Sequence, residues 1–335
     1  MSPLLKHILR LIPSYRLLEE RKLELIKERD ALRGEFDRAR EELQSRLAVL
    51  EAERALLTDW VPFYAPGHYY SPLPSHVEIA EAFARGGFGP PFAAVDLNEA
   101  AQFERLERFA AYYPEQPFSG EPAAGRRFYL NNPSYGAFDA IMLYGMLREA
   151  RPRRIVEIGS GFSSAAMLDL DELVLGGSVE FTFIDPEMKR LRELLREGDA
   201  SRATLIERRV QEVPLDAFEA LGANDVLFID SSHVSKIGSD VNRIFFDILP
   251  SLAPGVLIHF HDIANNFEYP REWLENGRAW NEQYLLRAFL MYNAAFRVEL
   301  FSSWLHETRK AFLRDRMPLC SNVGGGQIWL RKLAP

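Results

Sequence analysis

The sequence predicts an α/β fold in which a doubly wound, mostly parallel sheet follows a long N-terminal helix. Three observations lead to this fold class. Short apolar runs alternate with helical stretches from about residue 126 onward, which is typical of a sheet with helices on both faces. The first of these runs leads directly into a glycine-rich turn. Residues 14–59 contain no proline and a single glycine, Gly34, so they favour one uninterrupted helix.

The length and composition allow one large domain with accessory segments. The chain has 335 residues, of which 47% are hydrophobic, so it can bury a sizeable core. We expect a helical oligomerisation segment over residues 1–59, an accessory region over residues 60–125 and the α/β domain over residues 126–335.

The helix expected over residues 14–59 carries an apolar stripe whose members lie three, four or seven positions apart. This spacing places them on one helix face. The stripe consists of Leu18, Leu25, Leu32, Phe36, Ala39, Leu43, Leu50 and Leu57. Charged residues interrupt it at Lys22, Arg29, Arg46 and Glu53. We expect a coiled coil that joins copies of this chain into a homo-oligomer. The alternative is a solvated helix that lies across the α/β domain.

Composition restricts the compartment and the partners. The formal net charge is −8 with no long basic run, which argues against a nucleic-acid partner. Cys320 is the single cysteine, so no internal disulfide can form, as expected for a cytoplasmic protein. No apolar run approaches the roughly 20 residues that cross a bilayer. Basic residues interrupt the apolar residues of segment 1–13, so we expect a short helix there that packs on its own oligomer rather than a signal peptide. Docking of that helix on a partner or membrane surface is the alternative.

The accessory region combines two short helices with an irregular segment. Prolines and a glycine interrupt residues 66–74 too often for regular structure. We expect helices over residues 76–84 and 98–111. The aromatic segment 67–74 is interpreted either as a substrate lid or as a plain packing segment.

The α/β domain is predicted to contain seven strands. They are expected at 154–158, 179–184, 203–207, 226–229, 256–260, 297–301 and 327–330. The helices are expected at 138–149, 163–175, 188–197, 215–220, 240–252 and 284–292.

The glycine-rich turn after the first strand is the strongest functional motif. Gly159 and Gly161 permit backbone conformations that a Cβ would block, and they let a ligand approach the main chain closely. Ser163 and Ser164 are suited to cap the helix that follows. The turn lies at the carboxyl end of a parallel strand, where ligands of such sheets bind.

The residues around this turn argue against a dinucleotide. A dinucleotide site requires a third glycine where this sequence has Ser164. Glu157 stands two residues before the first glycine, where a carboxylate repels a pyrophosphate and attracts a sulfonium or ammonium group. None of the 12 tyrosines is followed four residues later by lysine, so the catalytic pair of a short-chain dehydrogenase is missing.

Three motifs in this order resemble a known enzyme family. They are residues 157–164, Phe228-Ile229-Asp230-Ser231-Ser232-His233, and Ile258-His259-Phe260-His261-Asp262. The chain is similar to the class I, Rossmann-like S-adenosylmethionine-dependent methyltransferases, in a bacterial family distantly similar to the catechol O-methyltransferases. The resemblance covers about residues 128–330. It implies a seven-stranded sheet with an antiparallel last strand and S-adenosylmethionine as cofactor.

The resemblance assigns cofactor contacts at the ends of four strands. Glu157, Gly159, Ser160, Gly161, Ser163 and Ser164 would form the first contact region. Asp185, at the end of the second strand, would accept both ribose hydroxyl protons, although alone it would more simply cap a helix. Gln211 would contact the adenine beside an apolar wall at Val210, and in a metal-free site Asp230 would contact the methionine amino group.

The reaction centre is expected where the fourth and fifth strands end. His259 and His261 are two residues apart, so both point to one sheet face. Methyl transfer to oxygen requires removal of a proton, and a histidine suits that step near neutral pH. His233 lies three residues after Asp230, where the catechol enzymes hold a lysine base. We expect His233 to act as general base, with Asp230 and His261 beside it. The alternative is a histidine that only hydrogen-bonds the cofactor or caps the next helix.

A catalytic divalent metal is the second possibility at this centre. The resemblance suggests Asp230, His261 and Asp262 as its ligands. Magnesium prefers all-oxygen sites, whereas one histidine with two carboxylates suits manganese, iron or zinc better. Without a metal, we expect His261 to hydrogen-bond the acceptor.

The acceptor is the least defined part of the prediction. Five aromatic and polar residues precede the last helix, a combination that suits a sugar or another polyol; they are Trp273, Trp280, Asn281, Glu282 and Gln283. Asn131 and Asn132 precede the first helix of the domain in a similar way. We expect O-methylation of a small polar acceptor such as a sugar or glycan precursor. The alternatives are a non-catalytic nucleoside-binding assembly protein and a metal-dependent oxygenase or hydroxylase on the same fold.

Overall fold

The computed structural model describes residues 13–58, 64–86, 92–322 and 326–334. Contacts divide the chain into two compact units, Met1–Leu73 and Pro74–Pro335. The predicted helix over residues 1–13 lies outside the described residues except for its last position. No helix in the described part of the chain combines the length and the apolar character that a membrane span requires. The cytoplasmic location stays a prediction.

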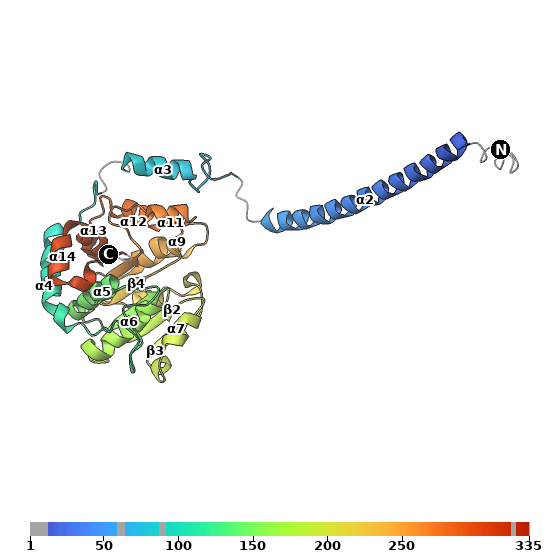
Figure 1. Ribbon diagram of the computed structural model, residues 1–335. Coiled ribbons are helices and arrows are strands. Elements are labelled where there is room, and N and C mark those ends of the chain that lie inside the picture. Colours follow the sequence, from blue (N-terminus) through green and yellow to red (C-terminus); the bar gives the residue numbers. More distant parts are fainter. Residues whose placement is uncertain (1–12, 59–63, 87–91, 323–325, 335) are drawn as a thin grey trace. The chain divides into compact units, whose positions relative to one another are not determined.

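The first unit is dominated by α2 (Pro13–Thr58), which runs without interruption as the absence of proline predicts (Figure 1). Its apolar stripe is not covered by any described residue of the unit: the side chains of Leu18, Leu25, Leu32, Phe36, Leu43 and Leu50 are between 50% and 71% exposed. The side chain of Leu57 lies outside the described ones. The coiled coil stays a prediction, but the exposed stripe provides the surface that it needs.

The second unit is built on a seven-stranded sheet, as predicted. The strands are β1 (Arg154–Ile158), β2 (Glu180–Ile184), β3 (Ala203–Ile206), β4 (Val226–Ile229), β5 (Leu257–His261), β6 (Phe296–Phe301) and β7 (Gln327–Lys332). Their order is β3-β2-β1-β4-β5-β7-β6. The pairs among the first five strands are parallel, whereas β7 runs antiparallel to both β5 and β6. The order reverses between β1 and β4, so the ligand crevice is expected there.

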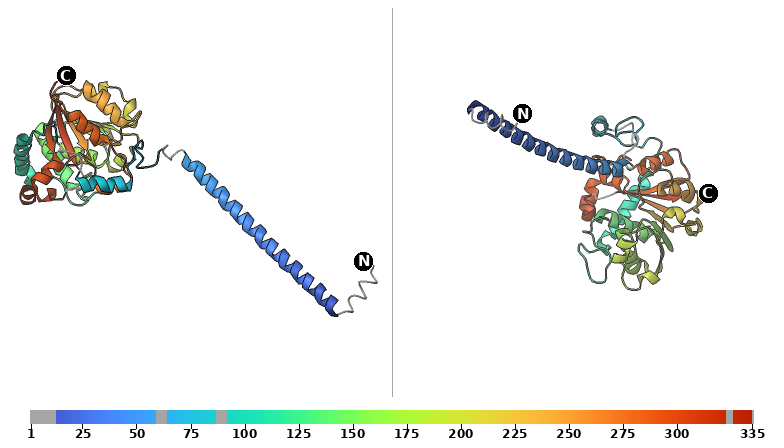
Figure 2. Two further views of the ribbon diagram at one scale, coloured as in Figure 1. Left: turned by 90° about the horizontal axis from the view of Figure 1, so that it is seen from above. Right: turned by 90° about the vertical axis from the view of Figure 1, so that its right-hand side faces the viewer.

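Helices cover both faces of the sheet (Figures 1 and 2). The helices of the second unit are α3 (His76–Arg85), α4 (Glu99–Tyr112), α5 (Ala137–Ala150), α6 (Phe162–Leu170), α7 (Lys189–Leu194), α8 (Asp216–Glu219), α9 (Asp240–Arg243), α10 (Leu249–Ser251), α11 (Arg271–Glu275), α12 (Glu282–Leu290), α13 (Ser302–Thr308) and α14 (Lys310–Arg316) in the part of the chain that the structure describes. Of these, α3 contacts α11 rather than the sheet. The predicted helix 163–175 ends in a π-helical turn, and the predicted helix 240–252 is interrupted by another. The helices α11, α13 and α14 were not predicted, because each has at most seven residues and too few turns to show a periodic pattern.

The alternation along β5 decides which side chains reach each face. His259 and His261 stack at 5.6 Å between ring centroids, and His261 also contacts Tyr135, just ahead of α5. Phe260 points to the opposite face and packs on Phe245. The prediction that both histidines share one face is therefore confirmed.

The accessory helix α4 belongs to the unit that holds the sheet. Gln102 is fully buried and accepts a hydrogen bond from the N–H of Phe301, at the end of β6. Arg105 pairs with Glu299 of β6 at 2.7 Å and with Glu149 of α5 at 3.1 Å. Because these polar groups are buried or half-buried, their loss would leave partners unsatisfied, so α4 is tied to the sheet edge rather than loosely attached.

Candidate functional site

The glycine turn is shaped by how closely two strand ends approach each other. Gly159 adopts φ +85°, and a methyl group on its Cα would lie 1.9 Å from the carbonyl oxygen of Asp230. The Asp230 N–H donates to the carbonyl of Ile158 at 2.9 Å, and the Gly159 N–H donates to that of Ile184. A side chain is excluded at Gly159 for conformational and steric reasons, so this glycine fixes β1 beside β2 and β4.

Glu157 lies behind the turn and supports it. Its carboxyl group is fully buried and accepts hydrogen bonds from the hydroxyls of Ser163, at 2.5 Å, and Ser164. Ser164 Oγ in turn accepts from the N–H of Gly161. Burial raises the pKa of Glu157 to about 8 against the opposing effect of the two hydroxyls. The group is therefore mostly neutral at pH 7, and it offers the ligand neither a surface nor a full charge.

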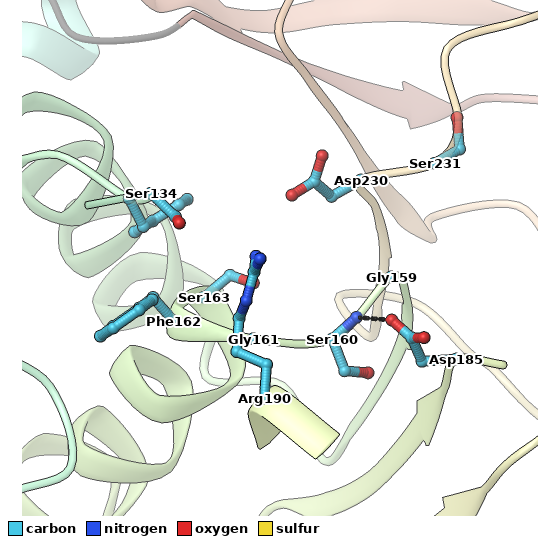
Figure 3. A pocket seen from close by; sticks show the side chains of 11 residues that line it. Ser134, Gly159, Ser160, Gly161, Phe162, Ser163, Asp185, Arg190, Asp230 and Ser231 are labelled. Carbon is cyan, nitrogen blue, oxygen red and sulfur yellow. Dashed lines mark hydrogen bonds between the residues drawn. The ribbon is translucent and has the colours of Figure 1, made fainter. Parts of the chain in front are cut away.

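Asp185 connects the end of β2 to the same turn. Its carboxylate accepts the N–H of Ser160 at 2.8 Å and the N–H of Glu187 at 2.7 Å. Figure 3 shows the bond to Ser160 and the carboxylate beside the turn. Each carboxylate oxygen retains a second lone pair, so Asp185 can still accept the two hydroxyl protons of a ribose.

One pocket opens over this turn, between the ends of β1, β2 and β4. Its lining consists of Ser134, Tyr135, Gly159, Ser160, Gly161, Phe162, Ser163, Asp185, Arg190, Asp230 and Ser231. The structure thus brings six predicted cofactor residues together around one space, namely Gly159, Ser160, Gly161, Ser163, Asp185 and Asp230. Glu157, Ser164 and Gln211 are not part of this lining. Gln211 instead donates to the carbonyl of Gly238 at 2.8 Å.

Three lining residues were not predicted from the sequence, namely Ser134, Tyr135 and Arg190, and Arg190 is the charged one among them. It stands in the first turn of α7, five residues after Asp185. Figure 3 shows its guanidinium directed into the pocket, across which Asp230 points from β4. The available signal was position, since a basic residue at the start of the helix after β2 lies at the same sheet edge as the turn.

The reaction centre is organised around His233. Its Nδ1 lies 2.8 Å from Oε2 of Glu282, at the start of α12, and its Nε2 lies 3.4 Å from Asp230 and 3.7 Å from Asp262. The ring also packs on Trp280 at 4.3 Å. Both His233 and Glu282 are buried. Sequence reasoning named Glu282 only as an acceptor contact, and its pairing with His233 depends on a fold contact 49 residues apart.

The backbone around His233 is held in an unusual conformation. His233 and Asp262 both adopt left-handed backbone angles, with φ +59° and +56°. The carbonyl of His233 accepts the N–H groups of Asn281 and Glu282, which fixes the start of α12 against this loop. Non-glycine residues in this region cost roughly 1–2 kcal/mol each, and such strain gathers at functional sites.

Carboxylates surround the imidazole of His233 and favour its protonated form. Burial lowers its pKa, but the hydrogen bonds and charges of Asp230 and Glu282 prevail and raise the pKa to about 10. Burial likewise lowers the pKa of His261, but Asp230, Asp262 and Asp139 raise it above its usual value. Without ligand, His233 therefore holds a proton at neutral pH.

Three donors lie close enough to bind one metal ion. Ligand atoms of Asp230, His233 and Asp262 all fall within 4.8 Å of one another. The predicted set contained His261 in place of His233. His261 Nε2 lies 3.8 Å from Asp262, and His261 does not join the group found among the described residues. Two carboxylates and an imidazole suit manganese, iron or zinc, so these residues fit a transition metal better than magnesium.

The amide residues predicted to contact the acceptor mainly fix loops. Asn281 accepts the N–H of Ser235 and donates to its carbonyl, which holds the loop after β4. Gln283 accepts the N–H of Ala264 and holds the loop after β5. Asn132 organises its own turn through four hydrogen bonds to residues 129–135. Their role toward an acceptor stays a prediction.

Aromatic rings flank the reaction centre. Trp280 lies between His233 and Trp273, and Arg278 covers both tryptophans at 4.7 and 5.2 Å. Both tryptophans are half-buried, so part of each ring faces solvent. The predicted lid, residues 67–74, straddles the boundary between the two units, so its role stays a prediction.

Comparisons with known proteins identify a domain in this part of the chain. A family model described as a methyltransferase domain matches residues 156–263, which span the turn and the reaction centre. An uncharacterised protein of Archaeoglobus fulgidus is 34% identical over 171 residues, which cover 48% of this chain and 75% of that protein.

Solved methyltransferase structures resemble the chain only distantly. An SAH-bound methyltransferase of Podospora anserina, PaMTH1, is 15% identical, with 78% of this chain and 98% of that chain covered and a TM-score of 0.39. The O-methyltransferase TomG of Streptomyces achromogenes, in complex with SAM, is 15% identical over 69% and 90% of the chains, with a TM-score of 0.37. A Bacillus cereus O-methyltransferase in complex with SAH is 13% identical over 70% and 91%, with a TM-score of 0.36.

Proposed function

The chain belongs to the class I, Rossmann-like family of S-adenosylmethionine-dependent methyltransferases, and from this premise we propose that it methylates a hydroxyl of a small polar acceptor. One observation carries the proposal. The pocket over the glycine turn and the His233 centre share Asp230, so a cofactor bound in the pocket would end beside the imidazole.

The cofactor is S-adenosylmethionine, held along the ends of β1, β2 and β4. The turn Gly159–Gly161 supplies a surface without side chains at its two glycines, and Asp185 accepts the ribose hydroxyls. Asp230 faces the positively charged end of the methionine. Glu157 acts from behind the turn, because its carboxyl group is occupied by Ser163 and Ser164. Gln211 remains the proposed adenine contact; it does not line the pocket, so it would have to give up its bond to the carbonyl of Gly238.

His233 is the proposed general base, and Glu282 orients it. The bond from Nδ1 to Glu282 leaves Nε2 facing Asp230 and Asp262, on the side where an acceptor hydroxyl would meet the methyl group. In the ligand-free state the imidazole keeps its proton. Cofactor binding adds a sulfonium charge beside Asp230, which opposes the charge that holds this proton. Cofactor binding therefore lowers the pKa of His233 and favours the neutral imidazole that can act as base.

A divalent transition metal is the alternative organiser of the same centre. Asp230, His233 and Asp262 would hold it, and the metal would supply Lewis-acid stabilisation of the acceptor oxygen. In that case His261, which is buried against Tyr135, is the remaining imidazole for proton removal. The two arrangements differ in one readout, since only the second loses activity to a chelator.

A sugar or glycan precursor is the proposed acceptor. Trp280 and Trp273 offer partly exposed aromatic faces next to His233, and aromatic faces of this kind stack on polyols. Dimers formed through the exposed stripe of α2 are the proposed oligomer, within the cytoplasm. Replacement of Leu25 and Leu32 by Glu should shift light-scattering mass to the monomer if the stripe is the interface.

The decisive experiment is transfer of labelled methyl from S-adenosylmethionine to a panel of polyols, sugars and sugar phosphates, with and without chelator. Product that requires both the cofactor and an acceptor supports the proposal. Calorimetry with S-adenosylmethionine provides the second arm. No cofactor binding would favour a non-catalytic assembly protein, and turnover that depends on added iron and oxygen without methyl transfer would favour an oxygenase.

A further inference from the structure

The pocket contains one positively charged side chain, Arg190, to which no role has been assigned above. Arg190 lines the pocket together with the turn and Asp230. Among the described residues it makes no hydrogen bond or ion pair within 4.0 Å. Its positive charge lowers the pKa of Asp230 from across the pocket. The other arginine of the same helix differs, because Arg192 pairs with Glu207 at 2.8 Å.

The local sequence makes room for Arg190 over the turn. A methyl group on Gly161 would lie 3.3 Å from Cδ of Arg190, so the glycine lets the arginine side chain cross the turn closely. Figure 3 shows the guanidinium above Gly161 and Ser163, with Asp230 facing it from β4. The pocket thus holds one guanidinium and two carboxylates, and it is the carboxylate of Asp230 that faces the guanidinium across the same space.

This charge arrangement matches one part of the cofactor. The methionine portion of S-adenosylmethionine carries an ammonium and a carboxylate on the same carbon. Asp230 can pair with the ammonium, and Arg190 can pair with the carboxylate through two parallel N–H bonds. The carboxylate would also lie near the first turn of α6, whose amino end favours an anion.

We propose that Arg190 binds the carboxylate of the cofactor and so selects S-adenosylmethionine over adenosyl compounds without that group. The inference rests on the proposed function, because it names a contact of the same cofactor. An anionic acceptor is the competing ligand for Arg190. The acceptor side of the centre, formed by His233, Asp262 and Trp280, does not line this pocket, which favours the cofactor.

The test compares two cofactors in two variants by calorimetry. Decarboxylated S-adenosylmethionine keeps the sulfonium and the amine but lacks the carboxylate. The wild type should bind it about 10- to 100-fold more weakly than S-adenosylmethionine, the range expected for a hydrogen bond between charged groups. In Arg190→Met the two affinities should agree within about threefold, because S-adenosylmethionine alone loses its partner. Arg192→Met is the matched control on the same helix and should keep the wild-type ratio.

The outcomes separate this inference from the proposed function. If Arg190→Met weakens both cofactors equally or neither, the carboxylate contact is refuted while cofactor binding stands. If its cofactor ratio is unchanged and only the KM of the acceptor rises, the guanidinium recognises an anionic acceptor and the inference is overturned. If the wild type binds neither cofactor, the proposed function itself fails. Arg190 is exposed, so the variant should fold, which an unchanged Tm would verify.

Discussion

The two halves of the candidate site are built in different ways. The β1–β2 half consists of a continuous turn and one aspartate, and backbone N–H groups satisfy most of its polar atoms. The β4–β5 half gathers His233, Asp262 and Glu282 from three separate segments, with side-chain contacts between charged groups. The first half is therefore a shape that local sequence can encode, and the second is a charge arrangement that only packing can assemble.

The electrostatics of the two halves differ as well. Behind the turn, Glu157 is buried with neutral hydroxyl partners, and its pKa rises to about 8. At the β4–β5 end, His233 is also buried, but the carboxylates of Asp230 and Glu282 outweigh burial and raise its pKa to about 10. Burial favours the neutral form in the first case, whereas paired charges overcome burial in the second. Substitutions should thus affect shape and binding in one half, and reactivity in the other.

The largest effect should come from Gly159→Ala, which would distort the turn in the β1–β2 half. The methyl group would meet the Asp230 carbonyl at 1.9 Å and would also occupy a left-handed residue. We expect the free energy of unfolding in urea to fall by about 3 kcal/mol or more, with loss of cofactor binding. Gly176→Ala is the control, because Gly176 has φ +93° but no atom within 4 Å of the added carbon. It should lose only about 1–2 kcal/mol. An equal fall in the free energy of unfolding in the two variants would show that the close contact with the Asp230 carbonyl does not destabilise Gly159→Ala.

The next largest effect should come from His233→Asn, in the β4–β5 half. Loss of the base should lower kcat by about 10²- to 10⁴-fold, while the Kd for S-adenosylmethionine stays within about threefold. Methyl-transfer kinetics and calorimetry measure the two quantities. His76→Asn, on the surface of α3, serves as the control and should leave both unchanged. A kcat near the wild-type value in His233→Asn would remove His233 from the chemistry.

A smaller effect, confined to binding, should follow from Asp185→Ala. The ribose hydroxyls would lose their charged acceptor, so the Kd for S-adenosylmethionine should rise about 10- to 100-fold. At saturating cofactor, kcat should stay within about threefold, because the reacting atoms lie at the other half. Asp315→Ala removes an exposed carboxylate far along the chain and should change neither value. A fall in kcat without a change in Kd would contradict the division of labour between the halves.

The smallest effect should be the pH dependence that Glu157 gives to stability. Its pKa is raised to about 8 in the folded state from 4.5, so the folded protein binds the extra proton. Stability contributed at this site is fully present below pH 4.5 and is lost as pH rises through about 8. Glu157→Gln, which stays neutral, should therefore unfold at a higher Tm than the wild type at pH 9 but not at pH 5. An identical pH dependence of Tm in the two proteins would mean that Glu157 does not titrate in this range.

The sequence predicted the fold because its signals are local. All seven strands lie within one or two residues of their predicted ends, since apolar runs bounded by polar residues mark a strand wherever it pairs. The turn residues Gly159 to Ser163 and Asp185 were predicted for the same reason. The unpredicted helices α13 and α14 are short segments, and they are stabilised by burial of side chains such as Trp304, Leu305 and Leu313.

Several site residues make contacts that the sequence did not predict, because those contacts depend on distant partners. Glu157 was expected to face the ligand, but α6 brings Ser163 and Ser164 over its carboxyl group. Glu282 contacts the imidazole of His233, which the sequence did not predict. In the possible metal site, His233 rather than His261 lies beside Asp230 and Asp262. Arg190 carries no motif and is recognised only by the pocket that it lines.

The sequence by itself determined the α/β class, the number of strands, the glycine turn and the acidic residues that end the strands. These features follow from periodicity and from backbone conformations that favour glycine, and both are encoded by neighbouring residues. Only the tertiary structure decided which carboxylate is buried and neutral, which imidazole is charged and which side chains face the pocket. Such properties depend on solvent exclusion and on charges a few ångströms away, and chain folding brings those groups together from segments that share no local pattern.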